Sequence, residues 1–281
     1  MTFTLEGFDL DAFVAATLAE DLGAGGDVTS AAVIPAEARF EAVMDSRDAI
    51  TVCGLDIAAA FFRHLDAAAA ITMLVVDGDR VAPGTALMRI TGNARALLTA
   101  ERSALNTVQH LSGVATLTAA YVDAIAGSGA TLLDTRKTIP GLRRLEKYAT
   151  RTGGARNHRM GLWDAAMIKD NHVAVAGGVG PAAALAKAAG IATIIVEVDR
   201  LDQIEPAITA GATHLLLDNM APDMLRAAVA IVAGRVPTEA SGGVTLETIG
   251  AIARSGVRYV SVGRITQSAP AADIGLDFAE L

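Results

Sequence analysis

The chain has 281 residues, of which 52% are hydrophobic and 19% are charged, and its formal net charge at pH 7 is −8. This composition is typical of a globular protein with a sizeable core, and it excludes a disordered chain. The negative charge argues against a general nucleic-acid-binding protein, so we expect no nucleic-acid partner.

A mean hydropathy of +0.41 raises the question of a membrane protein. The uncharged stretch 103–122 carries Asn, Gln, Ser and Thr side chains that would be costly in lipid, so we expect no membrane span. The acidic N-terminal segment lacks the basic region of a secretory signal. A lone Cys53 excludes an intrachain disulfide and fits a reducing compartment, which predicts a cytoplasmic protein.

The first hundred residues combine helical and strand patterns, without a phosphate-binding loop or paired catalytic groups. Apolar spacing predicts helices over 9–22 and 55–65, and strands over 40–44, 50–53, 71–76 and 86–91. A long helix is expected over 96–126, with an interruption near Ser112 and Gly113.

From residue 130 onward, short apolar runs alternate with helical stretches. The expected strands are 131–134, 165–169, 193–198, 214–218, 236–241 and 259–263. Their spacing is mostly that of a βα unit, and near-continuous apolar strands indicate a parallel sheet that is covered on both faces. The sheet is either a barrel or doubly wound. The absence of a GxGxxG motif after the first strand weakens the doubly wound dinucleotide-binding alternative.

Polar side chains follow each of these strands at its C-terminal end. They are Asp134 to Lys137, Lys169 to Asn171, Glu197, Asp218 with Asn219, Glu239 with Ser241 to Gly243, and Gly263 with Arg264. In α/β barrels the loops at this edge converge on the active site. Helix caps alone are a poor explanation for six such groups in register, so the sequence predicts an active site here.

The charges within these groups indicate the ligand. Eight basic residues and one acidic residue, Glu146, lie between Arg136 and Arg159, which suits a small polyanion better than a solvated basic face. Glycines before a helix, as in Ser241–Gly243, let backbone N–H groups approach a phosphate. Two carboxylates on adjacent strands, Glu197 and Asp218, suit ribose hydroxyls, Mg²⁺ held through a diphosphate, or a cationic sugar centre.

The histidines show no metal-binding spacing. We therefore expect structural or surface roles for His64, His110 and His214.

At these residues the sequence resembles the quinolinate phosphoribosyltransferase family. The resemblance runs nearly end to end, through EDLGAGGDVTS (20–30), ERSALNTVQHLSGVATLT (101–118), DTRKTIPGLRRLEKYATRTGGARNHRMGLWDAAMIKDNH (134–172), LLLDNM (215–220), EASGGVT (239–245) and SVGRITQSAPAADIGLDF (261–278). The long central motif is far more specific than any short glycine motif.

The resemblance implies an α/β fold in two parts. An N-terminal α/β sandwich over 1–112 is joined by the C-terminal tail, 267–281, and an open α/β barrel over 113–266 carries the active site. It also implies a homodimer in which Arg102 reaches quinolinate in the neighbouring subunit's site.

The remaining implied roles fall to residues of the barrel. Catalytic roles fall to Lys137, Lys169, Glu197 and Asp218, and the last two would face the ribose and Mg²⁺. The pyridine dicarboxylate would be bound by Arg136, His158 and Arg159, and the phosphoribosyl donor by Thr135, Lys137, Lys169, Ser241, Gly242, Gly243, Val262, Gly263 and Arg264. One departure is Gln267, where relatives commonly carry His. A neutral amide can hydrogen-bond to phosphate but carries no charge, so we expect no essential role there.

The implied reaction joins quinolinate to phosphoribosyl pyrophosphate and yields nicotinate mononucleotide, CO₂ and pyrophosphate, a step of NAD biosynthesis. Two rival interpretations remain open. One is a related phosphoribosyltransferase, either of the molybdenum-transport-associated kind or one that uses nicotinate. The other is a non-catalytic sensor of phosphoribosyl ligands.

Overall fold

The computed structural model describes residues 3–278 and divides them into two compact units. The first unit runs to Leu117 and adds the segments Arg144–Gly153 and from Ala269 onward. The second unit comprises Thr118–Arg143 and Gly154–Ser268. The sequence-based boundaries place residues 144–153 in the barrel, whereas the structure groups them with the first unit.

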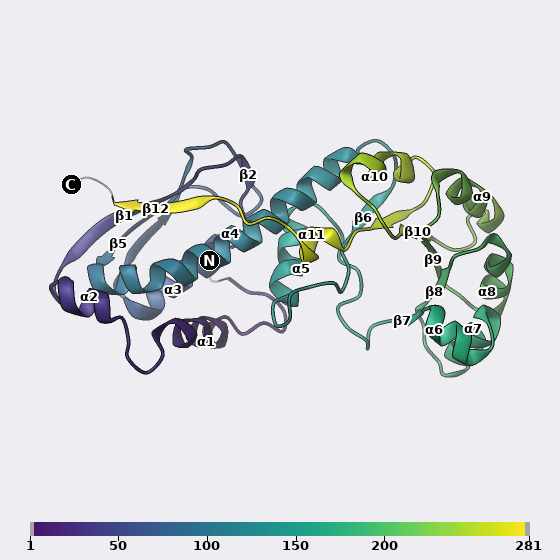
Figure 1. Ribbon diagram of the computed structural model, residues 1–281, viewed down its shortest axis with the longest axis horizontal. Coiled ribbons are helices and arrows are strands. Elements are labelled where there is room, and N and C mark those ends of the chain that lie inside the picture. The colour runs from purple at the N-terminus through teal and green to yellow at the C-terminus, as the bar shows by residue number, and fades with distance from the viewer. Residues whose placement is uncertain (1–2, 279–281) are drawn as a thin grey trace. The chain divides into compact units, whose positions relative to one another are not determined.

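The first unit is an α/β sandwich built on a four-stranded antiparallel sheet (Figure 1). The strand order is β12 (Ile274–Phe278), β1 (Arg39–Ser46), β5 (Ala86–Asn93) and β3 (Ala70–Met73). A small second sheet pairs β2 (Ile50–Thr51) with β4 (Arg80–Val81). The helices are α1 (Leu10–Leu22), α2 (Val28–Val33), α3 (Leu55–Leu65), α5 (Arg143–Thr152) and the first part of α4 (Ala94–Ala124). Pairing of β12 with β1 returns the C-terminal tail to this sheet, as expected.

Helix α4 is continuous over 31 residues, so the predicted interruption at Ser112 and Gly113 was wrong. A Cβ atom at Gly113 would lie 2.0 Å from the carbonyl oxygen of Pro270, so glycine is required here for close packing of the tail. The Ser112 hydroxyl accepts a hydrogen bond from the backbone N–H of Cys53 at 3.0 Å. Both residues serve packing between segments that are distant in the sequence, a role that local sequence does not reveal.

The second unit is an open α/β barrel with six parallel strands. Their order is β6 (Thr131–Leu133), β11 (Tyr259–Ser261), β10 (Thr238–Ser241), β9 (His214–Asp218), β8 (Ile194–Val198) and β7 (Ala166–Ile168). Strands β7 to β11 are neighbours in chain order, and β6 then pairs with β11, which is barrel winding rather than double winding. Strands β6 and β7 form the two edges, and the segment around Arg156 extends the sheet beside β6 through a bridge to Leu133.

Helices connect the strands and cover the outer side of the sheet (Figure 1). They are α6 (Asp170–Ala176), α7 (Val179–Ala188), α8 (Ile204–Ala210), α9 (Pro222–Val232), α10 (Leu246–Ala253) and α11 (Arg264–Gln267), with a short 3-10 turn at Leu201–Gln203.

The register of the parallel strands explains which side chains meet inside the barrel. Glu197 and Glu239 both pair with Leu216 of the strand between them. Two residues further along, Asp218 pairs with Ser241. Residues in register on neighbouring parallel strands point to the same face of a sheet. The alternation therefore stacks two polar layers at the C-terminal ends of β8 to β10.

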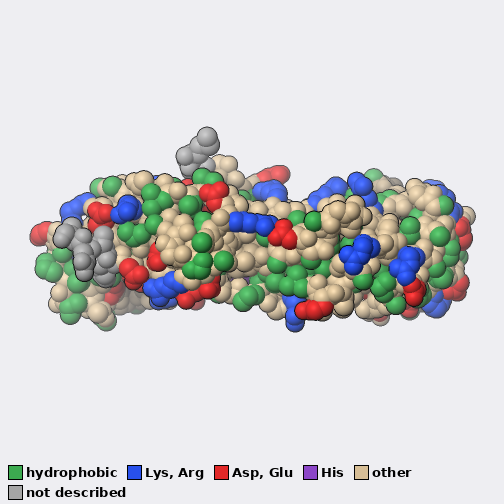
Figure 2. Space-filling model, turned by 90° about the horizontal axis from the view of Figure 1, so that it is seen from above, with side chains coloured by type: hydrophobic (Ala, Val, Ile, Leu, Met, Phe, Trp, Pro, Cys, Tyr) green, Lys and Arg blue, Asp and Glu red, His purple; other side chains and the backbone are tan. Residues whose placement is uncertain are grey.

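None of the helices in residues 3–278 combines the length and apolar composition that a membrane span requires. On the face drawn in Figure 2, the Lys and Arg side chains stand apart, with acidic, hydrophobic and neutral groups between them.

Candidate active site

A pocket of about 860 Å³ opens at the C-terminal ends of the barrel strands. Its size is typical of a site for one or two small ligands. The lining includes every barrel residue to which the family resemblance assigns a role, but not Asp134, Asp170 or Asn171 of the strand-end groups. The residues with an assigned role are Thr135, Arg136, Lys137, His158, Arg159, Lys169, Glu197, Asp218, Ser241, Gly242, Gly243, Val262, Gly263 and Arg264. Arg102 is not among the lining residues; it lies on α4 in the first unit, with an exposed side chain.

Asp134 positions two of the loops that form the pocket, although it does not itself line it. Its carboxylate is fully buried and accepts hydrogen bonds from the Asn157 side chain and from the backbone N–H of His158, each at 2.7 Å. The first residue of the central motif therefore ties the loop after β6 to the segment that carries His158.

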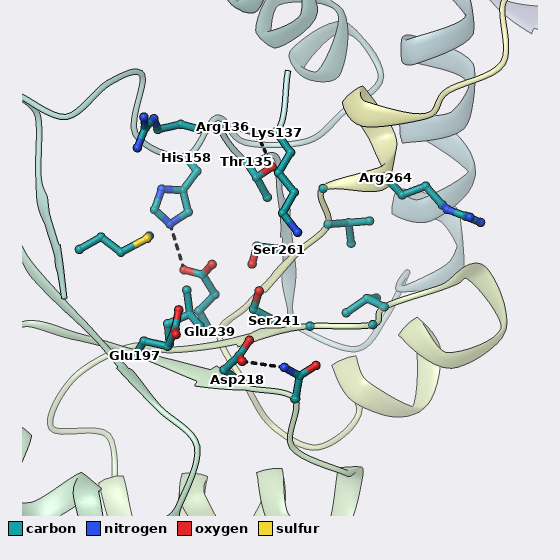
Figure 3. Close-up of a pocket in the computed structure, with 18 of the residues that line it drawn as sticks. Thr135, Arg136, Lys137, His158, Glu197, Asp218, Glu239, Ser241, Ser261 and Arg264 are labelled. Carbon is teal, nitrogen blue, oxygen red and sulfur yellow. Dashed lines mark hydrogen bonds and ion pairs between the residues drawn. The ribbon is translucent and has the colours of Figure 1, made fainter. Parts of the chain in front are cut away.

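The next three residues of the motif form a tight turn. The backbone N–H of Lys137 donates to the Thr135 hydroxyl at 3.0 Å, and the Thr266 hydroxyl donates to the Lys137 carbonyl at 2.7 Å. A Cβ atom at Gly263 would lie 2.7 Å from Cδ of Lys137, so glycine leaves room for the lysine side chain. Lys137 points into the pocket, toward Ser261 (Figure 3).

Two guanidinium groups lie at one side of the pocket. The Nε atom of Arg136 is buried and has no hydrogen-bond partner among the described residues. Arg159 donates to the Ala165 carbonyl at 3.1 Å, and its pKa is lowered by burial and then by the positive charge of Arg136. Two neighbouring positive charges, one with an N–H donor that has no partner, favour the binding of an anionic ligand between them.

Two carboxylates lie at another side, with a lysine. The Lys169 ammonium is 2.9 Å from Glu197, whose side chain is largely buried. Burial and the negative charge of Glu197 raise the pKa of Asp218, while the Asn219 amide donates to Asp218 at 2.6 Å. These acids repel each other in the ligand-free site, which a cationic centre or hydroxyl donors would relieve.

Glycine-rich loops form a third side of the pocket. Gly242 has φ +92°, and a Cβ atom there would lie 2.2 Å from the side-chain oxygen of Asn219. The loop leads into α10, whose first turn is capped by Thr245 and Thr248. The second loop runs through Gly263 into α11, and the Arg264 side chain extends away from the carboxylates (Figure 3). Backbone N–H groups at such loops suit phosphate oxygens.

Glu239 forms a buried cluster with two histidines, of which His158 lines the pocket. Glu239 is fully buried, and its Oε2 atom lies 3.2 Å from Nε2 of His158 and 3.0 Å from Nε2 of His214. Burial raises the pKa of Glu239, but its interactions with His158, His214 and Ser261 outweigh burial and bring the pKa to about 2. The His214 ring stacks on Tyr259, with 5.6 Å between the ring centroids.

The other histidines expected to be structural or on the surface are placed accordingly. His110 contacts the buried Glu146 at 2.9 Å, and His64 is exposed.

Sequence reasoning noted Glu239 and Asn219 at strand ends but gave them no role. It also assigned no role to the lining residues Met167, Leu216, Val244, Thr245 and Ser261; Gln267, where no essential role was expected, lines the pocket as well. Inward alternation along β9 to β11 is the signal that could have identified Glu239 and Ser261.

No group of three or more His, Cys, Asp or Glu side chains in the described part of the chain is arranged to hold a metal ion. The carboxylates of Glu197 and Asp218, which repel each other, still fit a Mg²⁺ whose other ligands are phosphate oxygens. Mg²⁺ sites of this type use one or two carboxylates and retain water.

Models of two protein domains match the chain. Residues 27–112 match the quinolinate phosphoribosyl transferase N-terminal domain, and residues 114–277 match the C-terminal domain of the same family.

Individual proteins are similar over nearly the whole chain. The nicotinate-nucleotide pyrophosphorylase [carboxylating] of Mycobacterium leprae is 43% identical over 266 residues, which cover 92% of this chain and 94% of that protein. The chloroplastic enzyme of the same name from Arabidopsis thaliana is 40% identical over 96% of this chain and 82% of its own length. The solved nicotinate-nucleotide pyrophosphorylase of Francisella tularensis superposes with a TM-score of 0.92 at 39% identity, covering 99% of this chain and 100% of that one.

Proposed function

The chain belongs to the quinolinate phosphoribosyltransferase family, and we infer that its barrel pocket carries out the family's reaction. Quinolinate and phosphoribosyl pyrophosphate are converted to nicotinate mononucleotide, CO₂ and pyrophosphate, in NAD biosynthesis. The observation that carries this proposal is the division of one pocket into a guanidinium side, a carboxylate side and two glycine loops. This division matches a dicarboxylate acceptor and a sugar-phosphate donor.

Quinolinate is bound at the guanidinium side. Arg136 and Arg159 pair with its carboxylates, and His158 lies beside them. Guanidinium groups bind carboxylates bidentately, which fixes the ring plane as well as the position.

The phosphoribosyl donor occupies the other two sides. The loops Ser241–Gly243 and Val262–Arg264 hold the 5′-phosphate through backbone N–H groups, with Thr135 close by. Lys137 and Lys169 meet the pyrophosphate, and Glu197 and Asp218 face the ribose. Glu197 and Asp218 would in part hold a Mg²⁺ that accompanies the pyrophosphate, and such a metal would supply positive charge to the leaving group.

In the transfer step, the pyridine nitrogen forms a bond to the anomeric carbon as the bond to pyrophosphate breaks. Positive charge develops on the sugar, where the carboxylates of Glu197 and Asp218 stabilise it, while Lys137 and Lys169 stabilise the departing oxygen. Holding both substrates in one pocket removes up to roughly 7–11 kcal/mol of entropic barrier in ideal cases.

In the decarboxylation step, the bond from C2 to its carboxylate breaks and CO₂ leaves. The electron pair stays at C2, stabilised by the adjacent quaternised nitrogen, and a proton from solvent then completes the C2–H bond. No protein nucleophile is needed, which agrees with a pocket lined by charges rather than by a nucleophile–base pair.

The proposed assembly is a homodimer in which Arg102 completes the quinolinate site of the neighbouring subunit. Its support is the family resemblance, together with the exposed position of Arg102 on α4. The cytoplasm is the proposed compartment, and its support is the lone Cys53, which is buried.

A pyrophosphate-release assay with quinolinate, nicotinate and nicotinamide in parallel tests the function. We expect turnover with quinolinate, and a kcat/KM at least about 100-fold lower with nicotinate, because a missing carboxylate leaves Arg136 or Arg159 unpaired. Comparable kcat/KM values for the two acids would contradict the assignment. Tight binding of phosphoribosyl pyrophosphate without release of pyrophosphate would favour the sensor.

A further inference from the structure

We propose that Glu239 is a positioning residue that fixes the His158 ring in one neutral tautomer and thereby holds the arginine side of the pocket. The proposal deepens the proposed function and rests on it for the identity of the ligand. Neither Glu239 nor His214 is among the residues to which the family resemblance assigns a role.

The hydrogen bonds at the His158 ring determine its protonation state. Its Nδ1 atom accepts the backbone N–H of Arg159 at 2.6 Å, so Nδ1 carries a lone pair rather than a proton. A neutral imidazole then has its proton on Nε2, which lies 3.2 Å from Oε2 of Glu239. An ionised carboxylate can only accept, so the two contacts agree on the Nε2–H tautomer. Figure 3 shows the His158 ring directly above the Glu239 carboxylate.

A second histidine contacts Glu239. Nε2 of His214 lies 3.0 Å from the same Glu239 oxygen, and the His214 ring is stacked on Tyr259. Tyr259 in turn accepts a hydrogen bond from Arg156 at 3.3 Å. The same carboxylate oxygen, Oε2, thus contacts both His158 and His214, and the His214 ring is held in turn by Tyr259 of β11.

The consequence for the ligand passes through Arg159. Its backbone N–H is held by His158, and its guanidinium is held by the Ala165 carbonyl at 3.1 Å. Arg159 is therefore held both at its backbone and at its guanidinium group before a ligand arrives. His158 acts by orientation, and the positive charge for the dicarboxylate comes from Arg136 and Arg159.

The tautomer can be read directly in the ligand-free protein. We expect ¹⁵N–¹H correlation spectra of the histidine-labelled full chain at pH 7.5 to show His158 as a neutral ring protonated on Nε2. The chain has only five histidines, and a His158→Gln variant assigns the signal. An Nδ1–H ring or a doubly protonated ring in the wild type would overturn the proposal, whatever the substrate is.

Kinetics test the consequence. Glu239→Leu removes the acceptor, and we expect KM for quinolinate to rise at least about tenfold while KM for phosphoribosyl pyrophosphate changes less than about twofold. Glu239→Gln keeps an oxygen acceptor in place and should restore most of the quinolinate affinity. Equal increases in both KM values, or no rescue by glutamine, would contradict a positioning role.

A matched control separates positioning from stability. Leu225 is a buried core residue of α9 in the same unit and does not line the pocket, so Leu225→Ala should lower Tm without changing the ratio of the two KM values. If Glu239→Leu does not fold, the KM values of Glu239→Gln and the spectrum of the wild type still test the positioning role of Glu239. If the wild type does not use quinolinate, the proposed function fails, while the spectrum tests the Glu239–His158 contact independently.

Discussion

The two units use half-buried acids in opposite ways. In the first unit, the Asp77 carboxylate accepts hydrogen bonds from the backbone of Gly54 and Leu55 and from the hydroxyl of Tyr148, at 2.7, 3.2 and 2.7 Å. In the barrel, Glu197 and Asp218 lie close enough that the charge of one raises the pKa of the other. An acid whose acceptor sites are filled by its own fold stabilises that fold, whereas acids left in mutual repulsion at a pocket are available to a ligand.

A substitution in the Ser241–Gly243 loop should give the largest loss of activity that is confined to the barrel. Gly242→Ala places a methyl group only 2.2 Å from the side-chain oxygen of Asn219, at a backbone angle of φ +92°. We expect kcat/KM for phosphoribosyl pyrophosphate to fall on the order of 100-fold, because a displacement of about 1 Å has that effect on positioned groups. Initial rates at varied donor concentration give the value.

Gly190→Ala is the matched control for backbone strain. Gly190 also has a left-handed backbone, φ +75°, but a Cβ atom there meets nothing within 4 Å. It should lose some stability and keep kcat/KM within about twofold. A similar loss of activity in both variants would show that strain, and not the loop's shape, is responsible.

Arg102 is the one residue of the first unit for which we propose a role in an active site. Mixing subunits tests this role. Arg102→Ala and Glu197→Ala should each be inactive alone. If Arg102 acts in the neighbouring subunit, a mixed dimer has one site with both defects and one with neither. Random exchange makes about half of the dimers mixed, so about a quarter of wild-type activity should return.

Recovery depends on exchange, which mass-tagged subunits verify. If Arg102 acts within its own subunit, every site keeps one defect, and mixing restores nothing. Confirmed exchange without recovery would remove Arg102 from the shared site and leave the first unit without a proposed catalytic contribution.

A smaller effect concerns stability and pH. Burial and the charge of Glu197 raise the pKa of Asp218, so the folded protein takes up a proton there at a higher pH than the unfolded chain. The ionised form therefore costs folding free energy at neutral pH, and this cost disappears as the pH falls toward the ordinary value of about 3.9. Asp218→Asn should raise Tm at pH 7 by on the order of 1–2 °C.

Thermal melts from pH 4.5 to 8 check this sign. The gain of Asp218→Asn over the wild type should shrink steadily as the pH is lowered. A variant that is less stable at pH 7, or whose gain grows at acidic pH, would show that Asp218 stabilises the barrel.

Much of this arrangement could be predicted from the sequence because parallel strands bring their C-terminal ends together. That rule placed Lys169, Glu197 and Asp218 in one pocket before any contact was known. It could not distinguish Asp134, which is buried and hydrogen-bonded to the backbone of His158, from the pocket-lining residues beside it. Nor could local patterns show that Gly113 serves the approach of Pro270, or that Glu239 meets histidines from two other segments. These contacts join residues far apart in the chain, and neither spacing nor periodicity reports them.

A matched pair of isosteric variants tests most directly whether the barrel acids serve function and the acid of the first unit serves the fold. Both Glu197→Gln and Asp77→Asn are measured for kcat and kcat/KM with quinolinate and for Tm. For Glu197→Gln we predict a fall in kcat on the order of 100-fold or more, with Tm within about 2 °C of wild type, since its exposed Lys169 partner contributes little stability. For Asp77→Asn we predict a Tm lower by about 2–8 °C and kcat/KM within about twofold of wild type. The reverse pattern, a destabilised but active Glu197 variant or a stable but inactive Asp77 variant, would contradict the account.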